Sequence, residues 1–310
     1  MDTLRIGTRG SRLAIWQANW VKDRLEERHP GLDARIVPIK TLGDKILDVP
    51  LAKVGGKGLF VKEIEKALLD GDIDLAVHSM KDVPTDLPEK LGIVGVTERE
   101  DPRDAVIANS PVPLLNLPAC SRIGTSSLRR QAQILAARPD FEVLPLRGNL
   151  NTRLQKLRDG RFDAILLATA GVKRLELENQ ITEILSIEAM LPAIGQGALG
   201  IEIRLDDEKT LGMVSFLDHE VTHLCVASER SFLHRLEGGC QVPVAAHGRR
   251  DKEEIVLEGL VASVDGKRVI RLEDRGPASE GEELGARLAD RVLSAGGREI
   301  LEELYCRELS

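Results

Sequence analysis

The sequence predicts an α/β protein with two lobes of related topology, followed by a smaller α+β domain. Short apolar strand patterns alternate with amphipathic helix patterns as far as about residue 217. Within that region one series of motifs occurs twice, which indicates an internal duplication. After about Asp218 a helix pattern is followed by three consecutive strand patterns, as expected for an antiparallel sheet.

The composition limits the classes of function. The chain has 310 residues, enough for two or three domains that each bury a core. Its net charge of -7 and its aromatic content of 3% argue against a nucleic-acid partner. No apolar run approaches the roughly 18 residues that a membrane span needs, and the N-terminus has no apolar signal core. The sequence contains no obvious apolar interface stripe. We therefore expect a cytoplasmic monomer with no membrane partner.

The first lobe should contain a strand at residues 4–8, a helix at 13–28 that ends before Pro30 and Gly31, and a strand at 35–40. A helix at 60–69 and a buried strand at 73–77 follow. Between them, residues 41–58 contain four glycines and a proline without a clean period, which predicts a long loop.

The duplication is visible in three pairs of segments. RIGT at 5–8 matches RIGT at 122–125, VPIK at 37–40 matches LPLR at 144–147, and LLDGDIDLAV at 68–77 matches LRDGRFDAIL at 157–166. The matched Pro and Gly lie 33 positions apart in the first copy (38 to 71) and 15 in the second (145 to 160). The difference of 18 equals the length of segment 41–58, so this segment is interpreted as an inserted lid loop that carries Lys53 and Lys57.

Two crossover segments set the domain boundaries. Residues 98–103 are polar and contain a proline, which suits a passage into the second lobe, and residues 191–204 suit the return. The first lobe is therefore predicted at 1–98 and 198–217, the second at 99–197, and the third domain at 218–310. The third domain should contain a helix to residue 236, strands near 242–249, 254–263 and 267–274, and helices near 282–295 and 298–304. Asp265-Gly266 is a hairpin signal between the last two strands.

Cationic residues follow several strands of both lobes, where ligands of open α/β sheets bind. They are Arg9, Lys40, Lys81, Arg129, Arg130, Arg147 and Arg153. Arginine binds carboxylates through a two-pronged contact, and the segments GTRGS and GTSS place helix N-terminal amides nearby. The pattern predicts a site for an anionic ligand at loop positions facing one cleft. The alternative for any single arginine is an exposed, solvated side chain.

Asp82 is the carboxylate that stands out among these cations. It directly follows a buried strand, and Pro84 forces Val83 to be extended, which fixes the direction of the carboxylate. Such a group could stabilise a developing positive charge or transfer a proton. The alternative is an aspartate that caps the turn and pairs with Lys81.

The segment LEGGCQVP at 236–243 presents a thiol. Two glycines allow a sharp turn, and Val242-Pro243 forces an extended exit, so Cys240 should lie at the apex. Cys120, Cys225, Cys240 and Cys306 have irregular spacing and form no disulfide framework. Cys240 is therefore placed for nucleophilic attack or permanent attachment, unless it is a small buried apolar residue.

Together with LEGGCQVP, four further blocks resemble the porphobilinogen deaminase (hydroxymethylbilane synthase) family: VHSMKDVP at 77–84, GTSSLRR at 124–130, LRGN at 146–149 and LPAIGQGALGIE at 191–202. The resemblance implies two periplasmic-binding-protein-like lobes linked by a two-strand hinge, plus a C-terminal α+β domain with a three-stranded antiparallel sheet. It implies a transferase of porphyrin biosynthesis that joins four porphobilinogen molecules head to tail into hydroxymethylbilane and releases ammonia. It also implies one dipyrromethane cofactor per chain, attached to Cys240 through a thioether.

The resemblance assigns roles to individual residues. Asp82 matches the catalytic position. Cofactor-binding positions are matched by Lys81, Asp82, Thr125, Ser127, Arg129 and Arg130. Substrate-binding positions are matched by Arg9, Ser11, Phe60, Arg147, Arg153, Arg174 and Gln196. Gly10 and Arg12 depart modestly from the family pattern.

Two other functions are compatible with parts of the sequence. A non-catalytic two-lobed protein that binds a carboxylated ligand would explain the lobes and the arginines but leaves Cys240 without a role. The segment HEVTH at 219–223 fits a zinc-binding HExxH motif, yet it has no suitable third ligand and lies away from the expected cleft, so no metal is expected.

The attachment of the cofactor can be tested by mass. Cys240→Ser should fold but lose both the added mass and nearly all activity, because no thiol remains to form the thioether. Cys120→Ser, Cys225→Ser and Cys306→Ser should each retain the added mass and most of the activity. Intact-mass spectrometry of the four variants checks this, and an adduct that persists on Cys240→Ser would refute the assignment.

Overall fold

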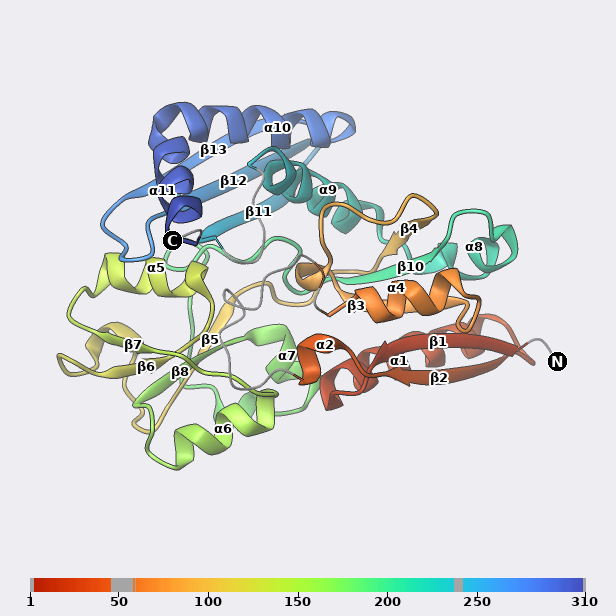
Figure 1. Cartoon of the computed structure of the whole chain (residues 1–310), viewed down its shortest axis with the longest axis horizontal. Coiled ribbons are helices and arrows are strands. Elements are labelled where there is room, and N and C mark those ends of the chain that lie inside the picture. The colour runs from red at the N-terminus through yellow and green to blue at the C-terminus, as the bar shows by residue number, and fades with distance from the viewer. Residues whose placement is uncertain (1–2, 46–57, 59, 237–241, 309–310) are drawn as a thin grey trace. The chain divides into compact units, whose positions relative to one another are not determined.

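The computed structural model describes residues 3–45, 58, 60–236 and 242–308. The chain forms two compact units (Figure 1). Unit 1 comprises Met1–Asp48, Gly56–Glu100 and Gly197–His223, and unit 2 comprises Val49–Gly55, Asp101–Gln196 and Leu224–Ser310. Among the described residues no helix is long and apolar enough to cross a membrane.

Unit 1 is built on a five-stranded sheet of order β2-β1-β3-β10-β4. The parallel strands are β1 (Thr3–Arg9), β2 (Asp33–Ile39) and β3 (Leu75–Ser79). The strand β10 (Leu199–Arg204) runs antiparallel to both β3 and β4 (Leu91–Val96). The helices of this unit are α1 (Arg12–Arg28), α2 (Leu42–Lys45), α4 (Lys62–Leu69), α8 (Glu208–Val214) and the first turn of α9 (Glu220–Arg235).

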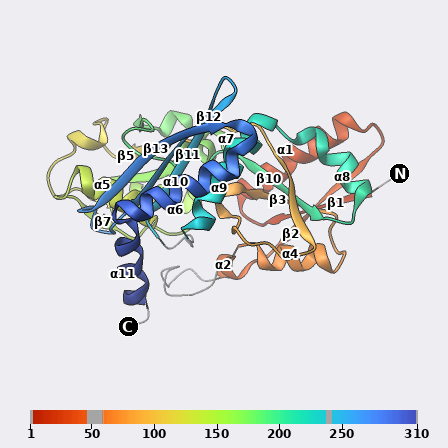
Figure 2. The ribbon, with the colours of Figure 1, turned by 90° about the horizontal axis from the view of Figure 1, so that it is seen from above.

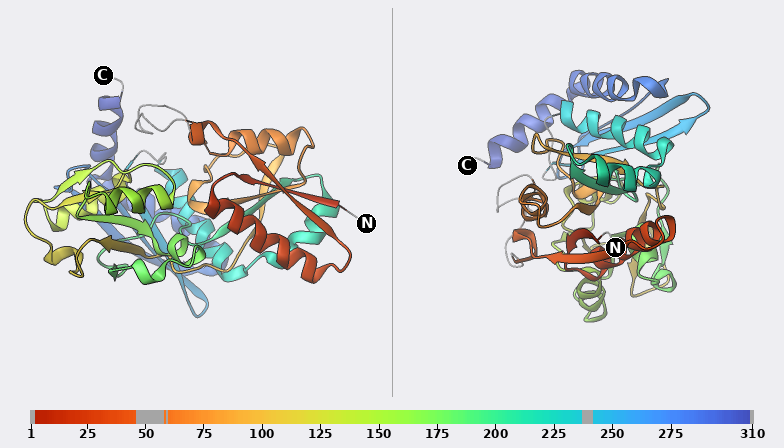
Figure 3. Two further views of the ribbon diagram at one scale, coloured as in Figure 1. Left: turned by 90° about the horizontal axis from the view of Figure 1, so that it is seen from below. Right: turned by 90° about the vertical axis from the view of Figure 1, so that its right-hand side faces the viewer.

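Helices cover both faces of this sheet, with α1 and α4 on opposite sides (Figure 3). On α1 the side chains of Ala18, Val21 and Leu25 are buried at helical spacing, and they pack with Leu75 and Val77 of β3. Ala76 points the other way and packs with Ile64 and Leu68 of α4. Successive β3 residues are thus buried on both faces of the sheet, which explains why Leu75, Ala76 and Val77 form a continuous apolar run.

The predicted long loop at 41–58 is partly wrong, because it begins with the short helix α2. Leu42 N–H at the start of α2 donates to Glu63 Oε1 of α4 at 2.8 Å, which ties the two helices together. Residues 46–57, with Lys53 and Lys57, lie outside the described residues.

The second lobe, within unit 2, has a five-stranded sheet of order β7-β6-β8-β5-β9. Its strands are β5 (Asp104–Ala108), β6 (Arg122–Gly124), β7 (Glu142–Leu144), β8 (Ala164–Ala168) and β9 (Glu183–Ile184). Its helices are α5 (Leu128–Ala137), α6 (Leu150–Arg158) and α7 (Thr169–Arg174). β6 is parallel to β7 and β8, whereas β5 is antiparallel to β8 and β9. This is the strand arrangement of unit 1, as the sequence duplication predicts.

The duplicated motifs form the same ion pair in each lobe. Arg5 of the first RIGT binds Asp74 through its Nη2 at 2.7 Å, and its backbone N–H donates to the same carboxylate at 2.7 Å. Arg122 of the second RIGT binds Asp163 in the same way, at 2.9 Å and 2.7 Å. Each pair therefore joins two neighbouring parallel strands near their starts. Arg5 of β1 binds the residue just before β3, and Arg122 of β6 binds the residue just before β8.

The C-terminal domain, also within unit 2, has an antiparallel sheet of β11 (Val244–Asp251), β12 (Glu254–Ala262) and β13 (Val269–Pro277) (Figure 2). The helices are α9, α10 (Gly281–Val292) and α11 (Arg298–Glu308), with a kinked segment at Leu293–Gly297 between the last two. Short 3-10 turns elsewhere are Met80–Asp82, Leu114–Asn116, Glu178–Gln180, Ser215–Leu217 and Ala278–Glu280. The predicted helix at 282–295 is confirmed, because α10 and the helical residues after it continue until Gly296, which adopts a φ of 109° and kinks the chain.

Both faces of this three-stranded sheet are covered. Phe232 of α9 and Leu288 of α10 pack on one face with Leu257. On the other face Leu260 packs with Ala132 of α5 and with Leu191. The C-terminal domain is thus attached to the second lobe through α5 and the segment around Leu191.

The β12–β13 hairpin tip lies directly against α5. Gly266 has a φ of 70°, and a Cβ at this position would lie 2.4 Å from Ala136 N and 2.5 Å from Ala132 O. Only glycine fits both the turn and the close approach to the helix backbone.

A buried cluster of titratable groups lies between α4, β3 and β10. His78 Nε2 is 2.8 Å from Glu202 Oε2, and both side chains are buried. Glu65 of α4 is buried beside them, and neither Glu65 Oε1 nor Glu202 Oε1 has a hydrogen-bond partner among the described residues. Burial raises the pKa of Glu65, and the nearby Glu202 charge raises it further, against smaller opposing effects of His78 and Lys62.

Stability should consequently depend on the ionisation of Glu65. Because its folded-state pKa is raised, its proton stabilises the fold fully at low pH, and this stabilisation is lost as the pH rises through the folded-state pKa. Glu65→Gln cannot ionise, so it does not lose this stabilisation at higher pH. The thermal midpoint of Glu65→Gln minus that of wild type should therefore increase as the pH rises. Calorimetry from pH 4 to 9, with the exposed Glu89→Gln as control, checks this. A difference that does not change with pH would contradict it.

The hairpin contact gives a second stability test. Gly266→Ala should destabilise the chain by about 1 to 3 kcal/mol, since it combines an unfavourable φ with overlap against the α5 backbone. Gly212→Ala is the matched control, because Gly212 lies in α8 and a Cβ added there would have nothing within 4 Å. That control should be neutral or slightly stabilising. Urea unfolding of both variants decides, and equal midpoints would show that the tip can move off α5 without cost.

Candidate functional site

Asp82 lies at the carboxyl end of β3, in the 3-10 turn Met80–Asp82. Met80 N–H donates to Ala198 O at 3.0 Å, and Val83 N–H closes the turn onto Met80 O at 3.2 Å. Val83 is extended, with φ -83° and ψ 124°, as Pro84 predicts. The turn is therefore fixed to the chain just before β10.

The Asp82 carboxylate is half-buried, and among the described residues it forms no hydrogen bond or ion pair. The alternative in which Asp82 serves to pair with Lys81 is thus not supported. An aspartate on a fixed turn that has no partner in the described part of the chain can act on a ligand.

Arg9, Ser11 and Phe60 lie near the neighbouring strand end. Arg9 ends β1, and its guanidinium carbon is 4.1 Å from the centre of the Phe60 ring, a cation–π contact. Phe60 in turn packs against Gly43, where a Cβ would lie 2.2 Å from the ring. Ser11 caps α1 by accepting from Ala14 N–H at 3.2 Å. Since β1 and β3 are parallel, these residues and Asp82 share one edge of the sheet.

In the second lobe the strand ends β6, β7 and β8 likewise share one edge. Thr125 follows β6, and its Oγ1 accepts from Ser127 N–H at 3.1 Å. Ser127 caps α5 by accepting from Arg130 N–H at 3.4 Å. Thr125 and Ser127, which match cofactor-binding positions of the family, thus also stabilise the start of α5 through their hydroxyl groups.

Arg129 and Arg130 do not lie on a loop, which corrects the sequence interpretation. They are in the first turn of α5, and both are about 5% exposed. They surround Asp104, which is fully buried: Arg129 Nη1 lies 2.8 Å from Oδ2, and Arg130 Nη2 donates to Oδ1 at 2.7 Å. Such burial requires a counter-charge, which Asp104 supplies.

Burial alone would raise the pKa of the Asp104 carboxyl, but the charges of the two arginines hold its pKa well below the usual range. Burial lowers the pKa of Arg129, opposed by its attraction to Asp104. The group is therefore an ionised carboxylate between two guanidinium groups.

Gln196 belongs to the same cluster. It is 1% exposed, and its Nε2 donates to Asp104 Oδ1 at 2.9 Å and to Pro102 O at 2.6 Å. Sequence reasoning placed it on the substrate side and overlooked Asp104. A signal was available, because two adjacent arginines next to an apolar helix face need a buried acid somewhere in the fold.

The remaining cations differ in exposure. Arg147 and Arg153 are half-buried, and Arg153 Nε donates to Gly148 O at 2.8 Å, which holds it over the loop before α6. Arg174, at the end of α7, is buried. Lys81 is half-buried beside Asp82.

Cys240 lies outside the described residues, and its described flanks are anchored. Leu236 and Val242 are both buried in the core of the C-terminal domain. The other three cysteines are free thiols, and Cys225 is buried.

The HExxH histidines take part in local capping. His219 Nδ1 is 2.9 Å from Thr222 Oγ1, and His223 Nδ1 is 2.7 Å from Asp218 Oδ1. In the described part of the chain no three metal-ligating side chains come together.

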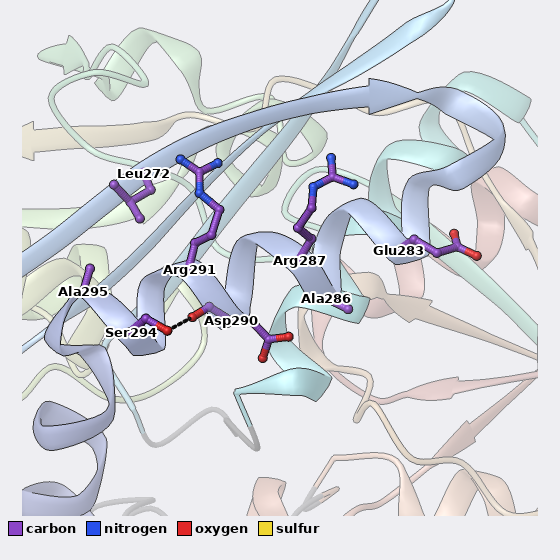
Figure 4. Close-up of a pocket in the computed structure, with 8 residues that line it drawn as sticks. All are labelled: Leu272, Glu283, Ala286, Arg287, Asp290, Arg291, Ser294 and Ala295. Carbon is purple, nitrogen blue, oxygen red and sulfur yellow. Dashed lines mark hydrogen bonds between the residues drawn. The ribbon is translucent and has the colours of Figure 1, made fainter.

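A surface pocket on the C-terminal domain is separate from these candidates (Figure 4). It is lined by α10 and Leu272, and its two arginines point toward β13, where Arg287 Nε donates to Asp274 Oδ2 at 2.9 Å. None of the sequence-predicted site residues lines it.

Comparison with known proteins identifies the family. The family profile described as "Porphobilinogen deaminase, dipyromethane cofactor binding domain" matches residues 4–212, and "Porphobilinogen deaminase, C-terminal domain" matches residues 223–294. The chain is 57% identical over 310 residues to the porphobilinogen deaminase of Geobacter sulfurreducens, covering all of this chain and 97% of that protein. It is 58% identical over 307 residues to that of Geobacter metallireducens, covering 99% and 96%.

Solved structures with a similar fold have much lower sequence identity to this chain than these relatives. They include the periplasmic VFT2 domain of Bordetella pertussis BvgS, with 13% identity, a TM-score of 0.42 and coverage of 69% of this chain and 85% of that one. The periplasmic aliphatic sulphonate binding protein SsuA from Escherichia coli has 14% identity, a TM-score of 0.40 and coverage of 76% and 71%.

The family profiles and the full-length relatives agree with the motifs in the sequence, and a non-catalytic binding protein is not favoured. The two profiles together span most of the chain, and the relatives span all of it. The chain belongs to the porphobilinogen deaminase family, transferases that use a dipyrromethane cofactor to join four porphobilinogen molecules into hydroxymethylbilane.

Proposed function

We propose that Asp82 is the catalytic residue of this transferase and that Cys240 carries its cofactor. The observation that supports Asp82 most is its position: a carboxylate without a partner among the described residues, at the carboxyl end of β3, on a turn fixed by Met80 to the chain before β10. A carboxylate held in this way needs little reorganisation when charge develops beside it.

The reaction places two demands on such a group. Each addition breaks the bond from the aminomethyl carbon of porphobilinogen to nitrogen and releases ammonia. The methylene carbon then forms a carbon–carbon bond to the free pyrrole carbon at the end of the growing chain, and that carbon loses its hydrogen as a proton. Positive charge develops on the substrate as ammonia leaves, and the Asp82 carboxylate stabilises it while accepting hydrogen bonds from pyrrole N–H groups. The same carboxylate can receive or return a proton within hydrogen-bond reach.

Arg129 and Arg130 are suited to bind the carboxylates of a dipyrromethane cofactor. Arg129 and Arg130 share a single counter-ion, Asp104, and the Nε of each arginine has no hydrogen-bond partner among the described residues. When bound, the dipyrromethane supplies the pyrrole end to which units are added. We propose that its side chains are held by Lys81, Thr125, Ser127, Arg129 and Arg130.

Substrate carboxylates are proposed to bind Arg9, Arg147, Arg153 and Arg174, with Ser11, Phe60 and Gln196 completing that side. The cation–π contact supports the pairing of Arg9 with Phe60, since the ring limits where the guanidinium can point. The side-chain amide of Gln196 already donates to Asp104, so its contribution to substrate binding is proposed to be indirect. Lys53 and Lys57 are proposed to belong to a lid over the site.

Three broader properties are also proposed. The domains are 1–98 with 198–217, 99–197 and 218–310. The chain acts as a cytoplasmic monomer, in keeping with the free thiols among its described cysteines. Nucleic acid is not a partner, as the net charge of -7 suggests.

Asp82→Asn tests the catalytic role, because it preserves shape and removes the charge. It should retain the adduct mass on Cys240 and bind porphobilinogen nearly as well, while its single-turnover rate falls by about 10² to 10⁴. Asp82→Glu should retain more activity. Rapid-quench measurement of one addition checks this, and a near-normal rate for Asp82→Asn would show that the carboxylate only supports the turn.

A further inference from the structure

Asp104 is the fixed point of a buried polar network in the second lobe. It is the first residue of β5, and because β5 is antiparallel to β8, it pairs in register with Ala168, the last residue of β8. Its carboxylate therefore lies at the edge of the sheet where the parallel strands end. Asp104 itself is fully buried, so it cannot reach solvent or a ligand directly.

Each guanidinium is held from two sides. Arg129 Nη1 donates to Leu191 O at 2.7 Å, and Arg130 Nη1 donates to Leu166 O at 3.0 Å. Asp104 binds the two groups from between them, at 2.8 Å and 2.7 Å. With one carbonyl and one carboxylate contact each, neither guanidinium is free to change its direction.

Gln196 and Gln133 complete the frame. Gln196 Nε2 donates to Asp104 Oδ1, and Gln133 both accepts from Leu191 N–H at 2.8 Å and donates to Leu191 O at 3.1 Å. The segment 191–196 is thereby tied to both Asp104 and α5. Rotation of the Asp104 carboxylate would break contacts to three side chains.

The charges in this frame do not balance. Two guanidinium groups share one carboxylate, and the Nε atoms of both arginines are buried without a hydrogen-bond partner among the described residues. Asp104 Oδ2 is also without a hydrogen bond there, so its contact with Arg129 Nη1 at 2.8 Å is an ion pair alone. A buried positive charge without a partner is costly, so an anionic group of a ligand is a favourable addition.

We propose that Asp104 is a positioning residue: it fixes the direction of Arg129 and Arg130 so that their remaining positive charge meets one carboxylate of the attached pyrrole. This rests on the proposed role of the two arginines in cofactor binding. It differs from a purely electrostatic role, in which Asp104 would only weaken anion binding by cancelling charge. It also differs from a purely structural role, in which Asp104 would affect folding alone.

Asp104→Glu separates these roles, because it keeps the counter-charge and moves it by one methylene group. Displacement by about an ångström should slow productive chemistry by about 10- to 100-fold while the charge balance is unchanged. The measurement is the rate at which newly made chain acquires the adduct mass when porphobilinogen is added, together with the thermal midpoint. The matched control is Asp163→Glu, which makes the same change at the Arg122 pair of the same lobe.

Adduct formation should be slow in Asp104→Glu and near wild type in Asp163→Glu. In the Arg130→Leu background, the additional effect of Asp104→Glu should fall to about 2-fold or less, because residues that act through one another are not additive. Full additivity, or wild-type adduct formation by a folded Asp104→Glu, would overturn the proposal.

If Asp104→Glu does not fold, Gln196→Met replaces it, and its rate of adduct formation is measured alone and together with Arg130→Leu. Gln196→Met leaves both ion pairs intact and removes the hydrogen bonds by which the Gln196 amide ties Asp104 to the Pro102 carbonyl. Slower adduct formation that is non-additive with Arg130→Leu supports positioning, and additivity or no change overturns it. Absence of any adduct on the wild-type chain would instead contradict the proposed function. The experiment therefore distinguishes a failure of the proposed function from a failure of the proposed role of Asp104.

Discussion

In each five-stranded sheet, one antiparallel strand brings its first residues to the edge where the parallel strands end. In unit 1 this strand is β10, and the residue before it, Ala198, accepts the hydrogen bond from Met80 that fixes the turn of Asp82. In the second lobe it is β5, whose first residue is Asp104. Both groups of candidate residues thus depend on a reversal of strand direction beside a parallel pair, at the edge where ligands of α/β sheets usually bind.

The two lobes also bury charge in different ways. Around Asp104 the positive groups outnumber the negative one, and the excess suits an anionic ligand. Around His78 the acids outnumber the base, and burial together with the Glu202 charge raises the pKa of Glu65. An ion cluster whose charges do not balance contributes little to folding stability, and this is one reason why we propose a ligand-binding role for the arrangement around Asp104.

Local patterns allowed the fold to be predicted more fully than the site. The alternation of strands and helices and the repeated RIGT motif were enough for two lobes, because these signals depend on neighbouring residues. That Arg5 and Arg122 pair with Asp74 and Asp163 could not be inferred, since the partners lie 69 and 41 positions away. Asp104 was missed and Gln196 was given a different role for the same reason. The two side chains form a hydrogen bond with each other across 92 positions of sequence, and local patterns do not reveal such a contact. The start of α2 was missed because glycine in the sequence suggested a loop.

The place of β10 within its sheet also has a consequence for synthesis of the chain. It lies between β3 and β4, although it follows the entire second lobe in the sequence. Until Leu199–Arg204 leaves the ribosome, β3 and β4 cannot be joined, and each presents a row of unpaired backbone groups. The second lobe has no such gap, because its strands come from the continuous stretch 104–184. The sheet of unit 1 is therefore begun first and completed last, and its open strand edges are exposed while the second lobe is being made.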